Sequence, residues 1–309
     1  MVSFSVSLTG KPPSFVDRTA FPLKGDITTS EPTIRDVKAA VTTKFPKFGK
    51  ERQKITISGE KAPLADDVKL STLKGKELSV KDLGAQISWR GVYIIEYLGP
   101  ILIHALVYHF PKVFYGRDVV HSDLQTFLYL FVLVHFAKRE VETVYVHRFS
   151  HGTMPFSNVY KNCGHYWGLG GLVLAWDLYR PGASKIQTSN EYLRTIGLIL
   201  AFAEVSNLNT HMALRALRPT GSTKRAIPYG YGFDGPLTGA WGGVSCPNYF
   251  FESVAWGTVA WVSGSVGAWV FFIVGTGQML IWAKKKHAAY KKEFGSAYPK
   301  RKAMIPFIY

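Results

Sequence analysis

The hydrophobic and polar positions divide this chain of 309 residues into two unlike parts. Residues 1–82 alternate short apolar runs with charged ones, whereas long apolar runs predominate over residues 83–309. Six of these runs come near the roughly 20 residues that cross a bilayer as a helix, at residues 91–110, 124–146, 163–179, 192–210, 247–263 and 265–283. We therefore expect a small N-terminal domain followed by a multi-pass α-helical membrane bundle of about six transmembrane helices.

Residues 1–82 show the periodicities of a small α+β domain. Short strands are predicted at residues 4–8, 55–57 and 78–80, with a further apolar patch near Phe21. Ile34, Val37 and Val41 lie at helical spacing between them. The order strand, strand, helix, strand, strand resembles a ubiquitin-like domain.

The basic residues indicate a membrane orientation. The formal net charge is +16, which could point to nucleic acid, but much of the excess lies beside apolar segments. Positive charge there orients transmembrane helices, so we expect both termini in the cytosol and no nucleic acid partner. The lysine-rich C-terminal tail suits either anionic lipid head groups or a polyphosphate ligand.

Several familiar signals are missing from the chain. Residues 1–10 lack the basic start and apolar core of a signal peptide. The two cysteines, Cys163 and Cys246, provide neither a disulfide framework nor a zinc ligand set, so no metal centre is expected. A glycine-rich dinucleotide fingerprint after a strand is also lacking, which argues against a Rossmann domain.

The fourth apolar segment carries a polar stripe. Glu204, Asn207, His211, Arg215 and Arg218 have the spacing that places side chains on one helical face. The cationic end of this stripe could hold the phosphates of a nucleotide, since arginine gives them forked hydrogen bonds. The alternative is a structural ladder of ion pairs between helices.

Two other segments carry ionisable groups. His135, Lys138, Glu142 and Tyr145 share one predicted face of the second segment, where Lys138 and Glu142 could simply pair with each other. Glu96 lies in the first segment, where an unpaired carboxylate would be costly.

The fifth segment begins with Asn248, Tyr249 and Glu252. Tyrosine is a neutral donor at pH 7, which suits protonation of an enolate-like centre. The alternative is an aromatic-belt tyrosine at the membrane interface. The polar neighbours of Tyr249 favour the catalytic interpretation.

Several sequence blocks carry a family resemblance. They are Asp82–Arg90 (DLGAQISWR), Glu96–Pro100 (EYLGP), Lys138-Arg139 with Glu142, Val146–Ser150 (VHRFS), Thr153–Pro155 (TMP), Lys161–Trp167 (KNCGHYW), Cys246–Tyr249 (CPNY) and Ile305–Ile308 (IPFI). Together they resemble the very-long-chain trans-2-enoyl-CoA reductases, which belong with the steroid 5α-reductases. The resemblance implies a multi-pass protein of the endoplasmic reticulum membrane. It also implies NADPH-dependent reduction of the C2=C3 double bond of a very-long-chain enoyl-CoA, the last step of fatty-acid elongation.

The resemblance also implies roles for single residues. The residues that match the essential ones of the family are Glu96, Lys138 and Tyr249, with Tyr249 as proton donor, Lys138 supporting it or binding phosphate, and Glu96 orienting the site. The residues that match its cofactor contacts are Asn207, His211, Arg218, Asn248, Glu252 and Tyr298. His211 stands where steroid reductases commonly carry aspartate, and Ala288 where a basic residue is usual.

The expected partners are the enoyl-CoA substrate, membrane lipids and other enzymes of the elongation cycle. Two alternatives stay open. A steroid or polyprenol reductase of the same family is disfavoured by the N-terminal domain and the Lys138-Arg139 block. A non-catalytic membrane scaffold with a ubiquitin-like domain would leave the intramembrane Glu96, Glu204 and Tyr249 unexplained.

Overall fold

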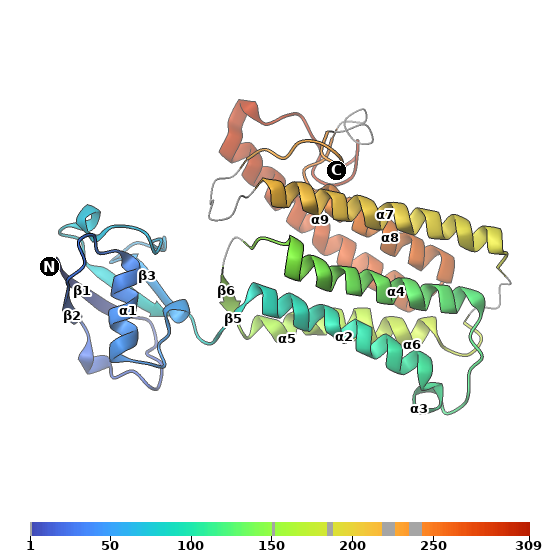
Figure 1. Cartoon of the computed structure of the whole chain (residues 1–309), viewed down its shortest axis with the longest axis horizontal. Coiled ribbons are helices and arrows are strands. Elements are labelled where there is room, and N and C mark those ends of the chain that lie inside the picture. The colour runs from blue at the N-terminus through green and yellow to red at the C-terminus, as the bar shows by residue number, and fades with distance from the viewer. Residues whose placement is uncertain (1, 150–151, 184–187, 218–225, 235–242) are drawn as a thin grey trace. The chain divides into compact units, whose positions relative to one another are not determined.

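The computed structural model describes residues 2–149, 152–183, 188–217, 226–234 and 243–309 (Figure 1). The chain forms two compact units. The first comprises Met1–Trp89 with His151–Val159, and the second comprises Arg90–Ser150 with Tyr160–Tyr309.

The first unit contains a four-stranded sheet covered by one helix. Its strands are β1 (Val2–Thr9), β2 (Leu23–Ile27), β3 (Gln53–Ile57) and β4 (Leu78–Asp82), in the order β2-β1-β4-β3. Strands β1 and β4 pair in parallel and the other neighbours are antiparallel. Helix α1 (Ile34–Lys44) buries Ile34, Val37 and Val41 in the same core as the sheet. The predicted α+β character of this region is confirmed.

A bidentate ion pair joins the residue that precedes β3 to the end of β4. Arg52 donates from Nε to Asp82 Oδ1 at 2.9 Å and from Nη2 to Oδ2 at 2.6 Å. The backbone N–H of Gly84 also donates to Asp82 Oδ1, at 3.0 Å. Burial acts to raise the pKa of Asp82, but these hydrogen bonds outweigh it and hold the pKa below its usual range. A short antiparallel ribbon of β5 (Gln86–Ser88) and β6 (Thr153–Pro155) completes the first unit.

The second unit is a bundle of helices that run side by side (Figure 1). They are α2 (Trp89–His109), α3 (Pro111–Tyr115), α4 (Asp123–Val141), α5 (Asn158–Cys163), α6 (Leu174–Leu178), α7 (Asn190–Ala216), α8 (Pro247–Ser263) and α9 (Val266–Phe294). π-Helical segments extend α4 over Glu142–Val146 and join α5 to α6 over Gly164–Val173. Helix α7 packs on α8, and α8 packs on α9. Apolar side chains mainly from α2, α4, α6, α7 and α8 form the core of this unit.

Among the described residues, two helical stretches are long and apolar enough to cross a membrane, Trp89–His109 and Val266–Ala297. The expected number of six is therefore not confirmed. The reason lies partly in composition, since Lys138 and Arg139 in α4 and Glu204 in α7 lower the hydropathy of those helices. The same charged residues build the candidate site.

Candidate active site

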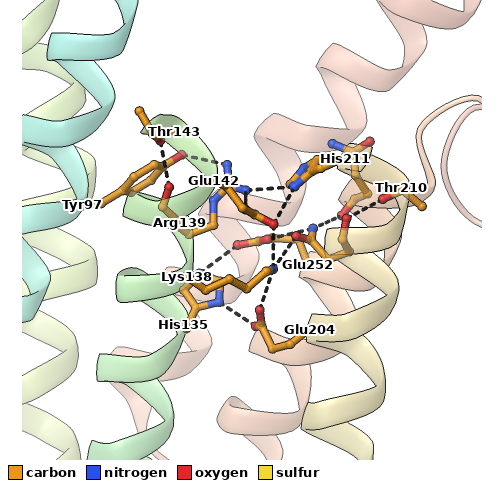
Figure 2. Close-up of polar contacts among 12 residues, drawn as sticks. Tyr97, His135, Lys138, Arg139, Glu142, Thr143, Glu204, Thr210, His211 and Glu252 are labelled. Atoms are coloured by element: carbon orange, nitrogen blue, oxygen red, sulfur yellow. Dashed lines mark hydrogen bonds and ion pairs between the residues drawn. The ribbon is translucent and has the colours of Figure 1, made fainter. Parts of the chain in front are cut away.

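Polar side chains from several helices meet inside the second unit (Figure 2). This polar cluster consists of Tyr97 from α2; His135, Lys138 and Arg139 from α4; Glu142 from the π-helical turn; Glu204, Asn207, Thr210 and His211 from α7; and Asn248 and Glu252 from α8. Apolar surroundings make an unpaired polar group expensive, so the hydrogen bonds within the cluster decide whether it is stable.

His135 joins three helices. Its Nδ1 lies 2.6 Å from Glu204 Oε1 on α7, and its Nε2 lies 3.2 Å from Glu252 Oε1 on α8. The ring is almost fully buried, with 1% of its side chain exposed. Ionised carboxylates only accept hydrogen bonds, so both ring nitrogens must carry hydrogen and His135 is an imidazolium ion.

Lys138 connects α4 chiefly to α7. Its Nζ donates to Glu204 Oε2 at 2.8 Å and to Asn207 Oδ1 at 2.7 Å. The predicted pair with Glu142, one turn along, is also present but longer, with 3.5 Å between Nζ and Oε1. The ammonium group of Lys138 therefore makes its contacts with other members of the polar cluster.

Arg139 links the cluster to α2. Its Nη2 donates to the Tyr97 hydroxyl at 3.0 Å, and its Nη1 forms an ion pair with Glu142. His211 Nδ1 lies 3.2 Å from Arg139 Nη1 and 3.1 Å from Glu142 Oε1. Depending on its tautomer, His211 accepts from the arginine or donates to the carboxylate.

The charges of the cluster balance. The cations are His135, Lys138 and Arg139, and the anions are Glu142, Glu204 and Glu252. Breaking a buried ion pair by removing one partner typically costs about 3–5 kcal/mol, because the other charge stays buried and uncompensated. Any one of these six side chains is therefore coupled to the others.

Asn207 and Glu252 lie side by side at the contact of α7 and α8. Asn207 Nδ2 donates to the backbone oxygen of Asn248 at 2.9 Å and to Glu252 Oε2 at 3.2 Å. Glu252 also accepts from Trp256 Nε1 at 3.2 Å. The predicted stripe on α7 thus does direct Glu204, Asn207 and His211 toward α4 and α8.

The remaining residues of the two predicted faces behave differently. Arg215 is half-buried one turn beyond His211, and Arg218 lies outside the described residues. Tyr145 was expected on the same face as His135 and Lys138, but 70% of it is exposed. The helix becomes π-helical from Glu142 onward, and its wider turn rotates the following side chains away from the predicted face.

Tyr249 faces α9. Its hydroxyl accepts a hydrogen bond from Lys286 Nζ at 2.9 Å, and the same ammonium lies 4.7 Å from the centre of the phenol ring. Among the described residues, the cation in contact with Tyr249 is thus Lys286, whereas Lys138, for which support of Tyr249 or phosphate binding was expected, contacts Glu204 and Asn207. Lys286 sits in a run of similar lysines near the end of α9, so its position in the sequence did not distinguish it.

Glu96 is buried on α2, and its Oε1 accepts from Asn162 Nδ2 at 2.5 Å. Tyr93 lies one turn before Tyr97, with 5.6 Å between the ring centres. The three residues proposed as catalytic thus have different hydrogen-bond partners, namely Asn162 for Glu96, Glu204 and Asn207 for Lys138, and Lys286 for Tyr249.

Tyr298 belongs to a second polar group near the end of the chain. Its hydroxyl lies 2.7 Å from Ser245 Oγ, and the same Oγ lies 2.6 Å from His287 Nδ1. Arg301 stacks over the Tyr298 ring with 5.6 Å between guanidinium and ring centre. Burial raises the pKa of Tyr298, so it stays a neutral donor or acceptor at neutral pH.

One group of side chains has the composition of a metal site. Ligand atoms of Glu142, His147 and His211 lie within 4.8 Å of one another. However, Lys138 and Arg139 already contact this carboxylate, which disfavours a further cation. His147 Nε2 is buried and has no hydrogen-bond partner within the described part of the chain.

Comparison with known proteins identifies the class. The family described as 3-oxo-5-alpha-steroid 4-dehydrogenase matches residues 152–309, and the chain belongs to this family. The chain is 38% identical over 292 residues to very-long-chain enoyl-CoA reductase of Dictyostelium discoideum, covering 91% of this chain and 93% of the relative. It is 47% identical over 234 residues to a predicted enoyl reductase of Schizosaccharomyces pombe, covering 76% and 77%.

A predicted very-long-chain enoyl-CoA reductase of Caenorhabditis elegans is 38% identical over 288 residues, which cover 89% of this chain and 91% of the relative. The resemblance drawn from the sequence blocks is thus confirmed, and the protein is an oxidoreductase. Its family and its two apolar helices mark it as a membrane protein.

Proposed function

We propose that this protein reduces the C2=C3 double bond of very-long-chain trans-2-enoyl-CoA with NADPH, the last step of the fatty-acid elongation cycle. The observation that carries the proposal is the mostly buried, charge-balanced polar cluster among the apolar helices, with Tyr249 one turn before Glu252 on α8. A cluster serving only as a ladder between helices would be replaceable by apolar side chains at little or no cost in stability. Its presence therefore favours a ligand or reaction site.

The residues present fit a nicotinamide cofactor. The carboxamide of nicotinamide needs both donors and acceptors, which Asn207, Glu252 and Asn248 offer together. His147 Nε2, which has no partner among the residues that the structure describes, adds a further polar atom in the same region. The ring centres of His147 and His211 are 4.8 Å apart. Arg215 and Arg218 would serve the phosphates, with His211 and Tyr298 completing the contacts. When bound, NADPH supplies a hydride to C3 of the substrate.

The side chains of the protein would manage the charge and proton that reduction requires. As C3 is reduced, negative charge develops on the thioester and C2 needs a proton. Tyr249 donates that proton, Glu96 orients the site from α2, and Lys138 fixes Asn207 for the cofactor. His135 acts indirectly by holding Glu204 and Glu252 in place.

A membrane location suits a substrate with a very long acyl chain, because the chain can stay among apolar helices while the charged CoA remains in water. We place the enzyme in the endoplasmic reticulum membrane as a multi-pass protein with both termini in the cytosol, supported by the basic loops. We also interpret residues 1–82 as a ubiquitin-like domain, supported by the order of strands around the parallel β1–β4 pair. Membrane lipids and other enzymes of the elongation cycle would be its partners.

The purified protein in nanodiscs tests the proposal. Stoichiometric oxidation of NADPH on addition of a very-long-chain trans-2-enoyl-CoA, with the saturated acyl-CoA found by mass spectrometry, would support it. A 3-oxo-4-ene steroid and a polyprenal serve as competing substrates in parallel reactions. Reduction of either in preference to the enoyl-CoA would assign a different activity within the family, and no oxidation with any substrate would favour the scaffold.

A further inference from the structure

Tyr249 and Lys286 form a pair that packing holds in place. Helices α8 and α9 pack along their length, and Tyr249 contacts the apolar cluster that contains the fully buried Ala283. The ring of Trp282 lies 6.4 Å from that of Tyr249. The ammonium of Lys286 both donates to the phenol oxygen and covers the ring face. Two contacts from one ammonium fix its position relative to the hydroxyl.

The direction of this hydrogen bond has a chemical consequence. A lysine ammonium carries three donors and no acceptor, so Lys286 can only donate to Tyr249. The phenol oxygen is therefore the acceptor, and its own hydrogen stays free to be donated elsewhere. A carboxylate in the same place would have the opposite effect, because it would accept the phenol hydrogen and hold it away from the substrate.

We propose that Lys286 is a positioning residue for the reduction, an inference that rests on the proposed function of Tyr249. Lys286 orients the phenol so that its hydrogen faces the substrate, and its charge stabilises the phenolate that remains after proton transfer. In this step the O–H bond of Tyr249 breaks and the C2–H bond of the substrate forms. The electron pair of the O–H bond stays on the phenolate oxygen, 2.9 Å from the ammonium in the resting pair.

The exposure of Lys286 explains how the phenol recovers its proton. Lys286 is exposed on α9, whereas Tyr249 is half-buried. Water that reaches the ammonium can therefore supply a proton to the phenolate through Lys286, which restores both groups for the next turnover. Lys138 is unsuited to this task, because its ammonium already binds Glu204 and Asn207.

The alternative to a positioning role is a simple cation–π contact, which is common and weakly stabilising. Kinetics separate the two interpretations. We expect Lys286→Met to lower kcat by about 10- to 100-fold, less than the roughly 10²- to 10⁴-fold contribution of a proton donor itself, because Lys286 acts through Tyr249. The KM for enoyl-CoA and the directly measured dissociation constant for NADPH should change by less than about threefold. The solvent deuterium isotope effect on kcat should rise, because proton transfer becomes more limiting.

Matched variants make the test specific. Lys285→Met removes the same charge from the adjacent position of α9, about 100° around the helix, and should leave kcat nearly unchanged. Lys286→Arg keeps the positive charge beside the phenol, but a guanidinium does not give up a proton, so its kcat should lie between those of the wild type and Lys286→Met. Because the side chain is exposed, ethylammonium in solution should partly rescue Lys286→Ala. This rescue still tests the inference if the methionine variant folds poorly.

A double variant decides whether Lys286 acts through Tyr249. In the Tyr249→Phe background, Lys286→Met should cost less than about twofold more in kcat, since the two effects are not additive when one residue serves the other. Full activity of Lys286→Met alongside a loss in Tyr249→Phe would overturn this inference and leave the proposed function intact. Independent, multiplicative losses would also overturn it. Failure of the wild-type protein to reduce enoyl-CoA would instead overturn the proposed function.

Discussion

His135 Nδ1 lies 2.6 Å from Glu204 Oε1, and this contact joins α4 to α7 in the interior of the bundle. The second ring nitrogen faces Glu252 on α8 at 3.2 Å. A doubly protonated histidine therefore holds two carboxylates whose neighbours, Lys138 and Asn207, are proposed to serve the reaction. The geometry of the candidate site thus depends on a residue that would touch neither substrate nor cofactor.

Replacing His135 by leucine should destabilise the protein by about 3–5 kcal/mol, because two carboxylates with only 13% and 20% of their side chains exposed lose their shared cation. Unfolding in detergent, followed by circular dichroism, measures this loss. His109→Leu is a matched control, since His109 is exposed and its Nε2 lies 3.0 Å from a neutral group, the Tyr129 hydroxyl. The control should lose no more than about 1 kcal/mol. Equal losses in the two variants would show that His135 does not carry the buried charge assigned to it.

The first unit should lose stability in acid through Asp82. Its pKa is lower in the folded state than in the unfolded chain, where it is about 3.9. The ion pair with Arg52 therefore stabilises the fold fully above about pH 4, and this contribution disappears as pH falls through the lower, folded-state pKa. Hydrogen exchange of the β3 and β4 amides in the full-length protein should report this change.

Asp82→Asn removes the ionisable group and provides the comparison. At pH 7 the variant should be less stable by about 1–3 kcal/mol, the usual range for hydrogen bonds to a charged group. Between about pH 5 and pH 2 the difference from wild type should shrink. A difference that stays constant over this range would exclude the Asp82 carboxylate as its source.

Part of the candidate site could be predicted from periodicity. The α-helical repeat correctly grouped Glu204, Asn207 and His211, because α7 is regular over that region. The same repeat failed for Tyr145, because it assumed α-helical turns where the chain forms a π-helix. A hydrophobic pattern carries little information about such a local change in helical pitch.

Other features depend on contacts between helices that sequence patterns do not specify. The preference of Lys138 for Glu204 over the nearby Glu142 follows from the approach of α4 and α7. The sequence does not distinguish Lys286 from the lysines beside it. Its contact with Tyr249 depends on how α8 packs on α9. In the first unit, by contrast, the alternating strands and the Ile34, Val37 and Val41 face lie where local patterns predicted them.

The basic residues beyond the α7 stripe should select NADPH over NADH. Arg218→Ala should raise the KM for NADPH by about tenfold or more, because a charged hydrogen bond to phosphate is lost. The KM for NADH, which lacks the 2′-phosphate, should change much less. Initial rates at matched ionic strength provide these values. A larger effect on the KM for enoyl-CoA would assign this arginine to the CoA phosphates instead.

Tyr249 is proposed to give its proton to the substrate, and Tyr249→Phe tests this role most directly because the ring and most of its packing remain. Tyr145→Phe makes the same chemical change at an exposed tyrosine and serves as the control. The measurement is single-turnover oxidation of NADPH with a trans-2-enoyl-CoA in nanodiscs. We predict a rate about 10²- to 10⁴-fold lower in Tyr249→Phe, with NADPH affinity and folding retained and the control unchanged. A near-normal rate in Tyr249→Phe would show that Tyr249 is not the proton donor.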